Sequence, residues 1–179
     1  MKNLGIFFGL LLCIFLSLVL QEFIPPLKVL GSARVDLVPV FFCFGALLLP
    51  FSFAVILALF TGLLVDLANL QILSGHVEIA LGWSIFLYVL FACILQGLRP
   101  VFLRGRWEIH AFASGICAII FLLGQFIMIT ARRGGVEIPP LAITKILVPG
   151  SIAFLLAPVV YFIAMLLGVR PAQGKARRY

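Results

Sequence analysis

Long apolar runs, broken by short polar and charged patches, make up most of this chain. Each run is long enough to cross or nearly cross a bilayer as a helix, because about 20 apolar residues span a hydrocarbon core of roughly 30 Å. The expected limits of the runs are about 4–22, 36–49, 51–67, 78–98, 108–130 and 141–168. The pattern predicts an all-α integral membrane protein with about six transmembrane helices, folded as a single polytopic domain over residues 1–179.

The second and third runs are short and adjacent. Together, residues 36–67 are too long for one span at about 1.5 Å per residue, and Pro50 predicts a turn between them. The pair forms either two thin spans or a re-entrant hairpin. Both arrangements return the chain to the same side of the membrane, so both place the two termini together.

The composition excludes a soluble domain. The chain is 64% hydrophobic and 11% charged, with a mean hydropathy of +1.29, so it cannot cover a core with a polar surface. A chain that lies almost entirely within the membrane also excludes most classes of enzyme.

The first apolar run follows Lys2, as in a signal peptide, but it lacks a cleavage site with small residues. We therefore expect it to be retained as a helix.

Basic residues are distributed unevenly between the two sides of this topology. Eight Lys and Arg fall on the side that holds the termini and five on the other, so we expect both termini to be cytoplasmic. The net charge of +7 then reflects topology and anionic lipid rather than nucleic acid. The short cytoplasmic tail, residues 170–179, and the loop near residue 104 are expected to contact lipid or a cytoplasmic partner. The residues for these contacts are Arg104, Arg106, Arg177 and Arg178.

Four residues spaced by four form one stripe on the third helix: Ala54, Ala58, Gly62 and Asp66. Small residues let helix backbones approach closely, and an ionisable group at membrane depth turns away from lipid. The stripe is therefore expected to face the helix bundle or a partner protein. The alternative is that Asp66 marks only the interfacial end of a short helix. Under the first interpretation, Asp66→Leu weakens assembly of a complex and leaves expression intact.

Arg34 and Asp36 stand just ahead of the second helix. The Asp36 carboxylate can accept hydrogen bonds from the exposed backbone N–H groups at the helix start and favourably meets the positive end of the helix dipole. Arg34 can pair with Asp36 or with a lipid phosphate. The pair is therefore either a structural cap or a binding site.

Three other helices carry features of helix packing. Pro149 and Pro158 are expected to bend or break the sixth helix, as a packed kink or as the lining of a substrate site. Pairs of small residues four apart can each form a packing face. These pairs are Gly5 with Gly9 on the first helix, and Ala111 with Gly115 and Ser114 with Ala118 on the fifth.

The sequence contains no pattern typical of catalysis or of a cofactor. His76 and Glu78 are two residues apart and would point to different faces of a helix, so the indication of a metal site is weak. The four cysteines fall within apolar runs without a CxxC pair, so neither a disulfide framework nor a zinc site is indicated. An intramembrane enzyme would need a nucleophile and base or a metal pair, and we expect a protein that is not an enzyme and binds no cofactor.

The segment from Arg34 to Tyr88 resembles the bacterial rod-shape-determining protein MreD family. In that family an Arg-Pro start to the second helix is followed by an Ala-Leu-Pro turn, a G-x-x-x-D-L motif and a small Gly-containing loop. Here Gly62, Asp66 and Leu67 match the G-x-x-x-D-L positions. Val35 replaces the usual proline, and residues 69–74 differ from the usual Gly-rich loop. The resemblance covers about a third of the chain.

The resemblance implies a non-enzymatic subunit of the cell-elongation complex in the bacterial inner membrane. Such a subunit controls cell shape by linking an MreC-like scaffold and MreB filaments to peptidoglycan synthesis. Its partners would include a RodA-like glycosyltransferase and a class B penicillin-binding protein.

The family is also similar in architecture to the six-helix substrate-binding subunits, or S-components, of energy-coupling-factor vitamin transporters. A vitamin-binding subunit is therefore the alternative function. It should present a cavity with converging polar groups near the outer side. The candidates for that cavity are Asp66, Asn69, Gln71, His76 and Glu78.

Overall fold

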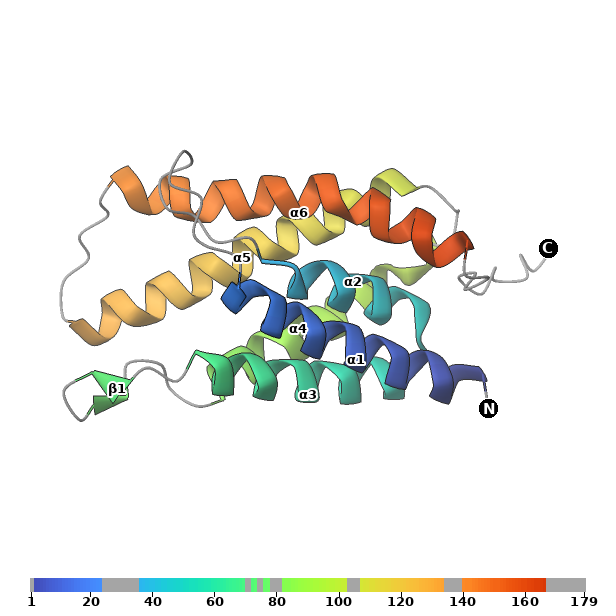
Figure 1. The fold of residues 1–179 in the computed structure, drawn as a ribbon, viewed down its shortest axis with the longest axis horizontal. Coiled ribbons are helices and arrows are strands. Elements are labelled where there is room, and N and C mark those ends of the chain that lie inside the picture. Colours follow the sequence, from blue (N-terminus) through green and yellow to red (C-terminus); the bar gives the residue numbers. More distant parts are fainter. Residues whose placement is uncertain are drawn as a thin grey trace.

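The computed structural model describes residues 2–23, 36–69, 72–73, 76–77, 82–102, 107–133 and 140–166. Within these ranges the chain forms six helices that run up and down in one bundle (Figure 1). Their bounds are α1 (Lys2–Phe23), α2 (Val38–Leu48), α3 (Phe51–Ala68), α4 (Trp83–Phe102), α5 (Trp107–Arg133) and α6 (Pro140–Leu166). The prediction of an all-helical architecture with six helices is confirmed.

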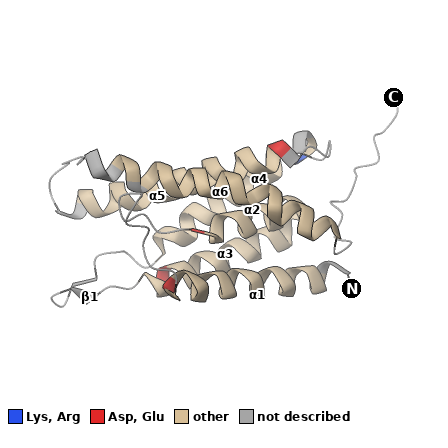
Figure 2. Ribbon diagram, turned by 45° about the horizontal axis from the view of Figure 1, so that its top comes forward, with Lys and Arg blue, Asp and Glu red and all other residues tan. Residues whose placement is uncertain are grey.

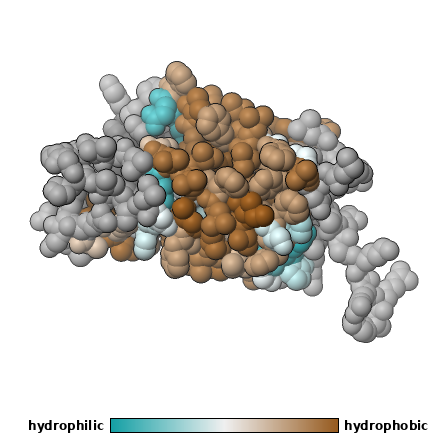
Figure 3. Space-filling view, turned by 90° about the horizontal axis from the view of Figure 1, so that it is seen from below, coloured by the Kyte–Doolittle hydropathy of each residue, from teal (hydrophilic) through white to brown (hydrophobic). Residues whose placement is uncertain are grey.

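Five of the six helices are long and apolar enough to cross a membrane, and α2 is not. The 11 residues of α2 rise only about 16 Å, roughly half of a hydrocarbon core. The prediction of about six transmembrane helices is therefore corrected to five candidate spans and one short helix. Figure 3 shows hydrophobic side chains across the middle of one face of the bundle, with polar patches toward its ends. The chain is a multi-pass protein embedded in a membrane.

The short helix α2 forms the centre of the bundle. Ten of its eleven residues are buried, and it packs against each of the other five helices. Phe42 is fully buried and meets the ring of Tyr88 edge to face, with ring centroids 4.8 Å apart. By contrast, the long helices expose large apolar side chains such as Phe8 on α1 and Phe86 on α4. Only lipid or another protein can cover those faces in a membrane.

The turn between α2 and α3 is built by Pro50. Proline disfavours a helical conformation in the preceding residue, and Leu49 is extended with ψ 154°. Pro50 then precedes the first turn of α3, where its missing N–H costs no helical hydrogen bond. The two helices thus form a hairpin whose first arm stays inside the bundle.

The segment between α3 and α4 differs from the expectation. The fourth helix was predicted from residue 78, but α4 begins at Trp83. Residues 72–77 instead contain a small antiparallel hairpin of β1 (Ile72–Leu73) and β2 (His76–Val77), in which Ile72 pairs with Val77. Gly82 has a φ of +104°, a left-handed conformation that a helix cannot contain, so the helix starts after it.

Helix α6 continues without a break through Pro149 and Pro158, so of the two expected outcomes, a bend or a break, the break does not occur. Neighbouring groups commonly re-satisfy the backbone around prolines in membrane helices. Figure 1 shows a change of direction toward the C-terminal end of α6.

The small residues of α5 lie where α5 crosses α6. A Cβ added at Gly115 would lie 3.3 Å from the carbonyl oxygen of Gly150.

The start of α1 and the end of α6 lie at the same end of the bundle (Figure 1), which we call the termini end. The opposite end holds the β1–β2 hairpin. Charged residues among the described ones sit near the helix ends, and the helix centres are free of charge (Figure 2). This distribution places polar groups where a bilayer meets water.

Candidate functional site

The stripe of small residues on α3 lies inside the chain. Ala54 and Ala58 are fully buried, Gly62 is buried, and Asp66 is 2% exposed. The stripe is therefore covered by this chain's own helices. Of the alternatives left open by the sequence, the structure places it against the bundle rather than against a partner.

Gly62 lies at the closest approach of α3 to α4. A Cβ added at this position would lie 2.4 Å from the Cα of Ile85 and 2.7 Å from its backbone nitrogen. Because both are backbone atoms, no side-chain rotation can make room for it. The glycine is what allows the two helix backbones to touch here.

Asp66, one turn further along α3, caps the start of α4. The backbone N–H of Gly82 donates to its Oδ2 at 2.6 Å, and the N–H of Ser84 donates to its Oδ1 at 3.2 Å. Ser84 belongs to the first turn of α4, which has no internal partners for its N–H groups, and Gly82 stands directly before that turn. The carboxylate also meets the positive end of the α4 dipole. We call Gly62, Asp66, Gly82 and Ser84 the α3–α4 joint.

Asp36 serves the start of α2 in a similar way. Its Oδ1 accepts a hydrogen bond from the backbone N–H of Val38 at 3.2 Å, as the structural interpretation of the sequence proposed. The same oxygen accepts a second bond from the side-chain amide of Gln21 near the end of α1, at 3.1 Å. Burial raises the pKa of Asp36 to about 6, although both hydrogen bonds lower it. The folded protein therefore holds the proton of Asp36 more tightly than the unfolded chain.

This pKa predicts a pH dependence that Asp36→Asn removes. In the wild type, stability is expected to fall as the pH rises from about 4 to about 6, because the folded state binds the extra proton in that window. Asparagine keeps an oxygen acceptor for Val38 and Gln21 and carries no charge. Melting temperatures of both proteins in detergent at pH 5 and pH 8 test this expectation. An equal pH dependence in wild type and variant would contradict it.

The other end of α2 is capped by the side chain of Gln96 on α4. Its amide nitrogen donates to the carbonyl oxygens of Ala46 at 2.6 Å and Leu49 at 2.8 Å. Arg99, one turn further, points a guanidinium nitrogen to the Leu48 carbonyl at 3.5 Å. The last carbonyls of a helix have no partner within the helix, and the side chains of Gln96 and Arg99 supply donors for them. The Arg99 charge also favourably faces the negative end of the helix dipole.

Replacing Gln96 with leucine is expected to lower the free energy of unfolding by about 1–3 kcal/mol, because two buried carbonyls lose their side-chain donor. The control is Gln125→Leu on α5, because Gln125 makes no hydrogen bond to any other described residue. Thermal unfolding in detergent compares the two variants. A lower melting temperature for Gln125→Leu than for Gln96→Leu would disprove the capping role.

The sequence analysis missed Gln21, Gln96 and Arg99. The available signal was a long polar side chain within an otherwise apolar helix, which must find a partner inside the protein. Trp83 was also missed: its indole N–H donates to the carbonyl of Gly124 at 3.2 Å and ties the start of α4 to α5. The acceptor is a backbone carbonyl and Gly124 has no polar side chain, so the sequence does not indicate this hydrogen bond.

Of the remaining predicted site residues, the structure describes the side chain of Asn69 only. Asn69 is half-buried at the end of α3, and its backbone N–H donates to the carbonyl of Val65 at 3.0 Å. The other predicted contacts have side chains outside the described part of the chain. They are Arg34, Gln71, His76, Glu78, Arg104, Arg106, Arg177 and Arg178.

Asp36, Asp66 and Gln96 each bind main-chain groups at a helix end. Over the described ranges, no group of three His, Cys, Asp or Glu side chains is arranged to hold a metal ion. The four cysteines are free, with Cys43 and Cys117 buried.

The chain matches no protein-family model, no curated protein and no solved structure.

Proposed function

We propose that this chain is a non-enzymatic membrane subunit of the bacterial cell-elongation complex, of the MreD family. In this role it controls cell shape by coupling an MreC-like scaffold and MreB filaments to the enzymes of peptidoglycan synthesis. The proposal extends to the fold, which would be the six-helix fold of the S-components. It also places the protein in the inner membrane with cytoplasmic termini.

The observation that carries the proposal is the G-x-x-x-D-L match at Gly62, Asp66 and Leu67 within a six-helix membrane architecture. The first two residues have a concrete physical task in the α3–α4 joint, where only glycine fits and a carboxylate is needed. Leu67 points outward and is 51% exposed. Two residues of the motif thus hold helices together and the third is exposed on the outer face of α3. This arrangement suits a protein that binds partners through the faces of its helices.

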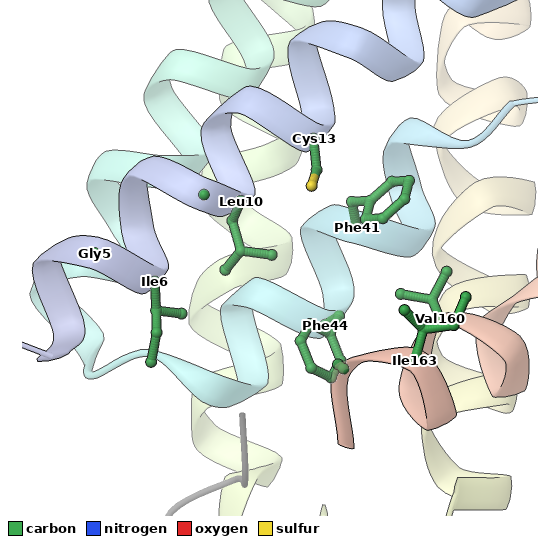
Figure 4. A pocket seen from close by; sticks show the side chains of 10 residues that line it. Gly5, Ile6, Leu10, Cys13, Phe41, Phe44, Val160 and Ile163 are labelled. Carbon is green, nitrogen blue, oxygen red and sulfur yellow. The ribbon is translucent and has the colours of Figure 1, made fainter. Parts of the chain in front are cut away.

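A vitamin-binding subunit has less support from the described residues. Asp66, its central polar candidate, directs both carboxylate oxygens at the backbone of Gly82 and Ser84. The groove between α1, α2 and α6 is lined by apolar side chains such as Phe44 and Val160 (Figure 4). Neither feature offers the converging polar groups that orient a small ligand.

Affinity purification from the native membrane tests the proposal. The tagged protein is extracted in mild detergent, and co-purifying proteins and small molecules are identified by mass spectrometry, with untagged membranes as the control. We expect an MreC-like scaffold, a RodA-like glycosyltransferase and a class B penicillin-binding protein. Recovery of an ATPase module or a vitamin would instead identify a transporter subunit and overturn the proposal.

A further inference from the structure

Arg99, a half-buried arginine in the last turn of α4, leaves most of its hydrogen-bonding capacity unused. A guanidinium carries five N–H donors, and among the described residues its one acceptor is the Leu48 carbonyl, 3.5 Å from Nη2. The Nε atom is enclosed by the protein and has no hydrogen-bond partner. No described carboxylate forms an ion pair with Arg99 either. A partly buried charge without a counter-charge is costly, so an acceptor from outside the described chain would stabilise it.

The start of α3 lies beside this guanidinium. Helices α3 and α4 run antiparallel, and Gly62 packs on Ile85 toward the end that holds the hairpin. At the termini end, the side chain of Gln96 donates to the carbonyl of Leu49, two residues before α3. Arg99 is about one turn beyond Gln96, so it stands just outside the first turn of α3. The backbone N–H groups of that turn point in the same direction.

No side chain caps the start of α3. Its N-cap is Pro50, and the first helical hydrogen bond runs from the N–H of Ala54 to the Pro50 carbonyl at 3.0 Å. The N–H groups of residues 51–53 therefore have no acceptor within the helix. These donors and the positive end of the α3 dipole add to the charge of Arg99. Together they favour an anion between the end of α4 and the start of α3.

The exposed neighbours of these donors indicate which anion reaches them. Phe51 is 55% exposed, and Leu98, next to Arg99 on α4, is 46% exposed. Both lie at the ends of candidate membrane spans, where large exposed apolar side chains meet hydrocarbon. The anion thus lies where acyl chains begin, which is the depth of the phosphate groups in a bilayer. A guanidinium also suits phosphate well, because its planar fork can donate two parallel hydrogen bonds.

We propose that Arg99 and the first turn of α3 bind the phosphate group of a phospholipid from the leaflet at the termini end. The Nη atoms of Arg99 donate to the phosphate oxygens, and the free N–H groups of residues 51–53 donate from the opposite side. The acyl chains of the lipid lie along Phe51 and Leu98. The phosphate supplies the counter-charge that the described chain does not provide.

Native mass spectrometry of the detergent-purified full chain tests the proposal. The probes are phosphatidylglycerol and a glucosyl diacylglycerol with identical acyl chains, which lacks the phosphate, added as an equimolar mixture. We expect the wild type to retain phosphatidylglycerol about tenfold over the glycolipid. Arg99→Gln keeps a donor for Leu48 but removes the charge and should abolish this preference. Arg99→Lys keeps the charge without the fork and should give an intermediate preference.

The matched control is Lys145→Gln, which removes the same charge near the start of α6, at the opposite end of the bundle. It should retain the wild-type preference for phosphatidylglycerol. An equal preference in Arg99→Gln and Lys145→Gln would show that net charge rather than this site selects the lipid, and would overturn the proposal. So would equal retention of both lipids by the wild type.

A second measurement on the wild type does not depend on the folding of a variant. Phosphatidylglycerol with a photoactivatable group on its glycerol headgroup, in nanodiscs, should cross-link within residues 51–53 and 98–100. Labelling spread evenly over the helix ends would contradict the proposal. A large excess of inorganic phosphate distinguishes the two sources of the ligand. The lipid should stay bound, and its release would assign the site to a soluble phosphate and overturn the lipid as its ligand.

Discussion

Replacing Gly62 with alanine is expected to lower the free energy of unfolding by about 1–3 kcal/mol, because a single added methyl group would overlap the backbone of Ile85. Helices α3 and α4 must then separate or slide, and the α3–α4 joint loses its geometry. The melting temperature in detergent should fall by roughly 2–4 °C for each kcal/mol. A thiol-reactive dye can follow the transition once the exposed Cys93 and the half-buried Cys13 are replaced, since Cys43 and Cys117 are buried until the bundle opens.

The matched control for Gly62→Ala is Gly97→Ala on α4, the helix against which Gly62 packs. The added Cβ at Gly97 would meet nothing within 4 Å. Alanine is a better helix former than glycine by about 0.5–1 kcal/mol, so this variant should melt at or above the wild-type temperature. The interpretation fails if both variants melt at the same temperature, because their difference rests only on contact with Ile85.

Replacing Asp66 with leucine is expected to cost about 2–5 kcal/mol, because the N–H groups of Gly82 and Ser84 would each lose their acceptor. Asp66→Asn retains one acceptor oxygen and should be intermediate. The expected order of melting temperatures is wild type, then asparagine, then leucine. This differs from the expectation based on sequence, in which the leucine variant weakens assembly of a complex and leaves expression intact.

Folding and complex formation can be separated for Asp66 in one experiment. Expression and melting temperature of the purified variant report on the α3–α4 joint, and co-purification from membranes reports on partners. If Asp66→Leu melts with the wild type but fails to recover partner proteins, Asp66 acts on a partner and the capping role is wrong. If the melting temperature of Asp66→Leu falls together with the recovery of partner proteins, the loss of partners follows from the loss of structure.

The positions of the helices were predictable because the bilayer sets the length of an apolar segment. The third helix was expected over 51–67 and spans Phe51–Ala68, and the turn at Pro50 was recognised from proline geometry alone. The start of α4 was not predictable, because it depends on the left-handed conformation of Gly82 and on the carboxylate of Asp66, 16 residues earlier in the chain. Neither feature produces a recognisable pattern in the residues next to it.

The candidate site was only partly predictable for a related reason. The stripe ending in Asp66 could be recognised from spacing, and the cap at Asp36 from its place before a helix. Their partners could not, since Asp66 binds backbone N–H groups and Gln96 binds backbone carbonyls, which every residue carries. Sequence patterns identify side chains that need a partner, but not which main-chain groups supply it.

By itself, the sequence determined that this chain is a helical membrane protein, the approximate places of its helices and the turn at Pro50. Apolar length and proline geometry are local properties, so they can be read along the chain. The tertiary structure alone decided that α2 is the buried centre and that α1 leaves a groove open toward α6. All six helices are apolar, so hydrophobicity does not distinguish a face that meets lipid from one that meets protein.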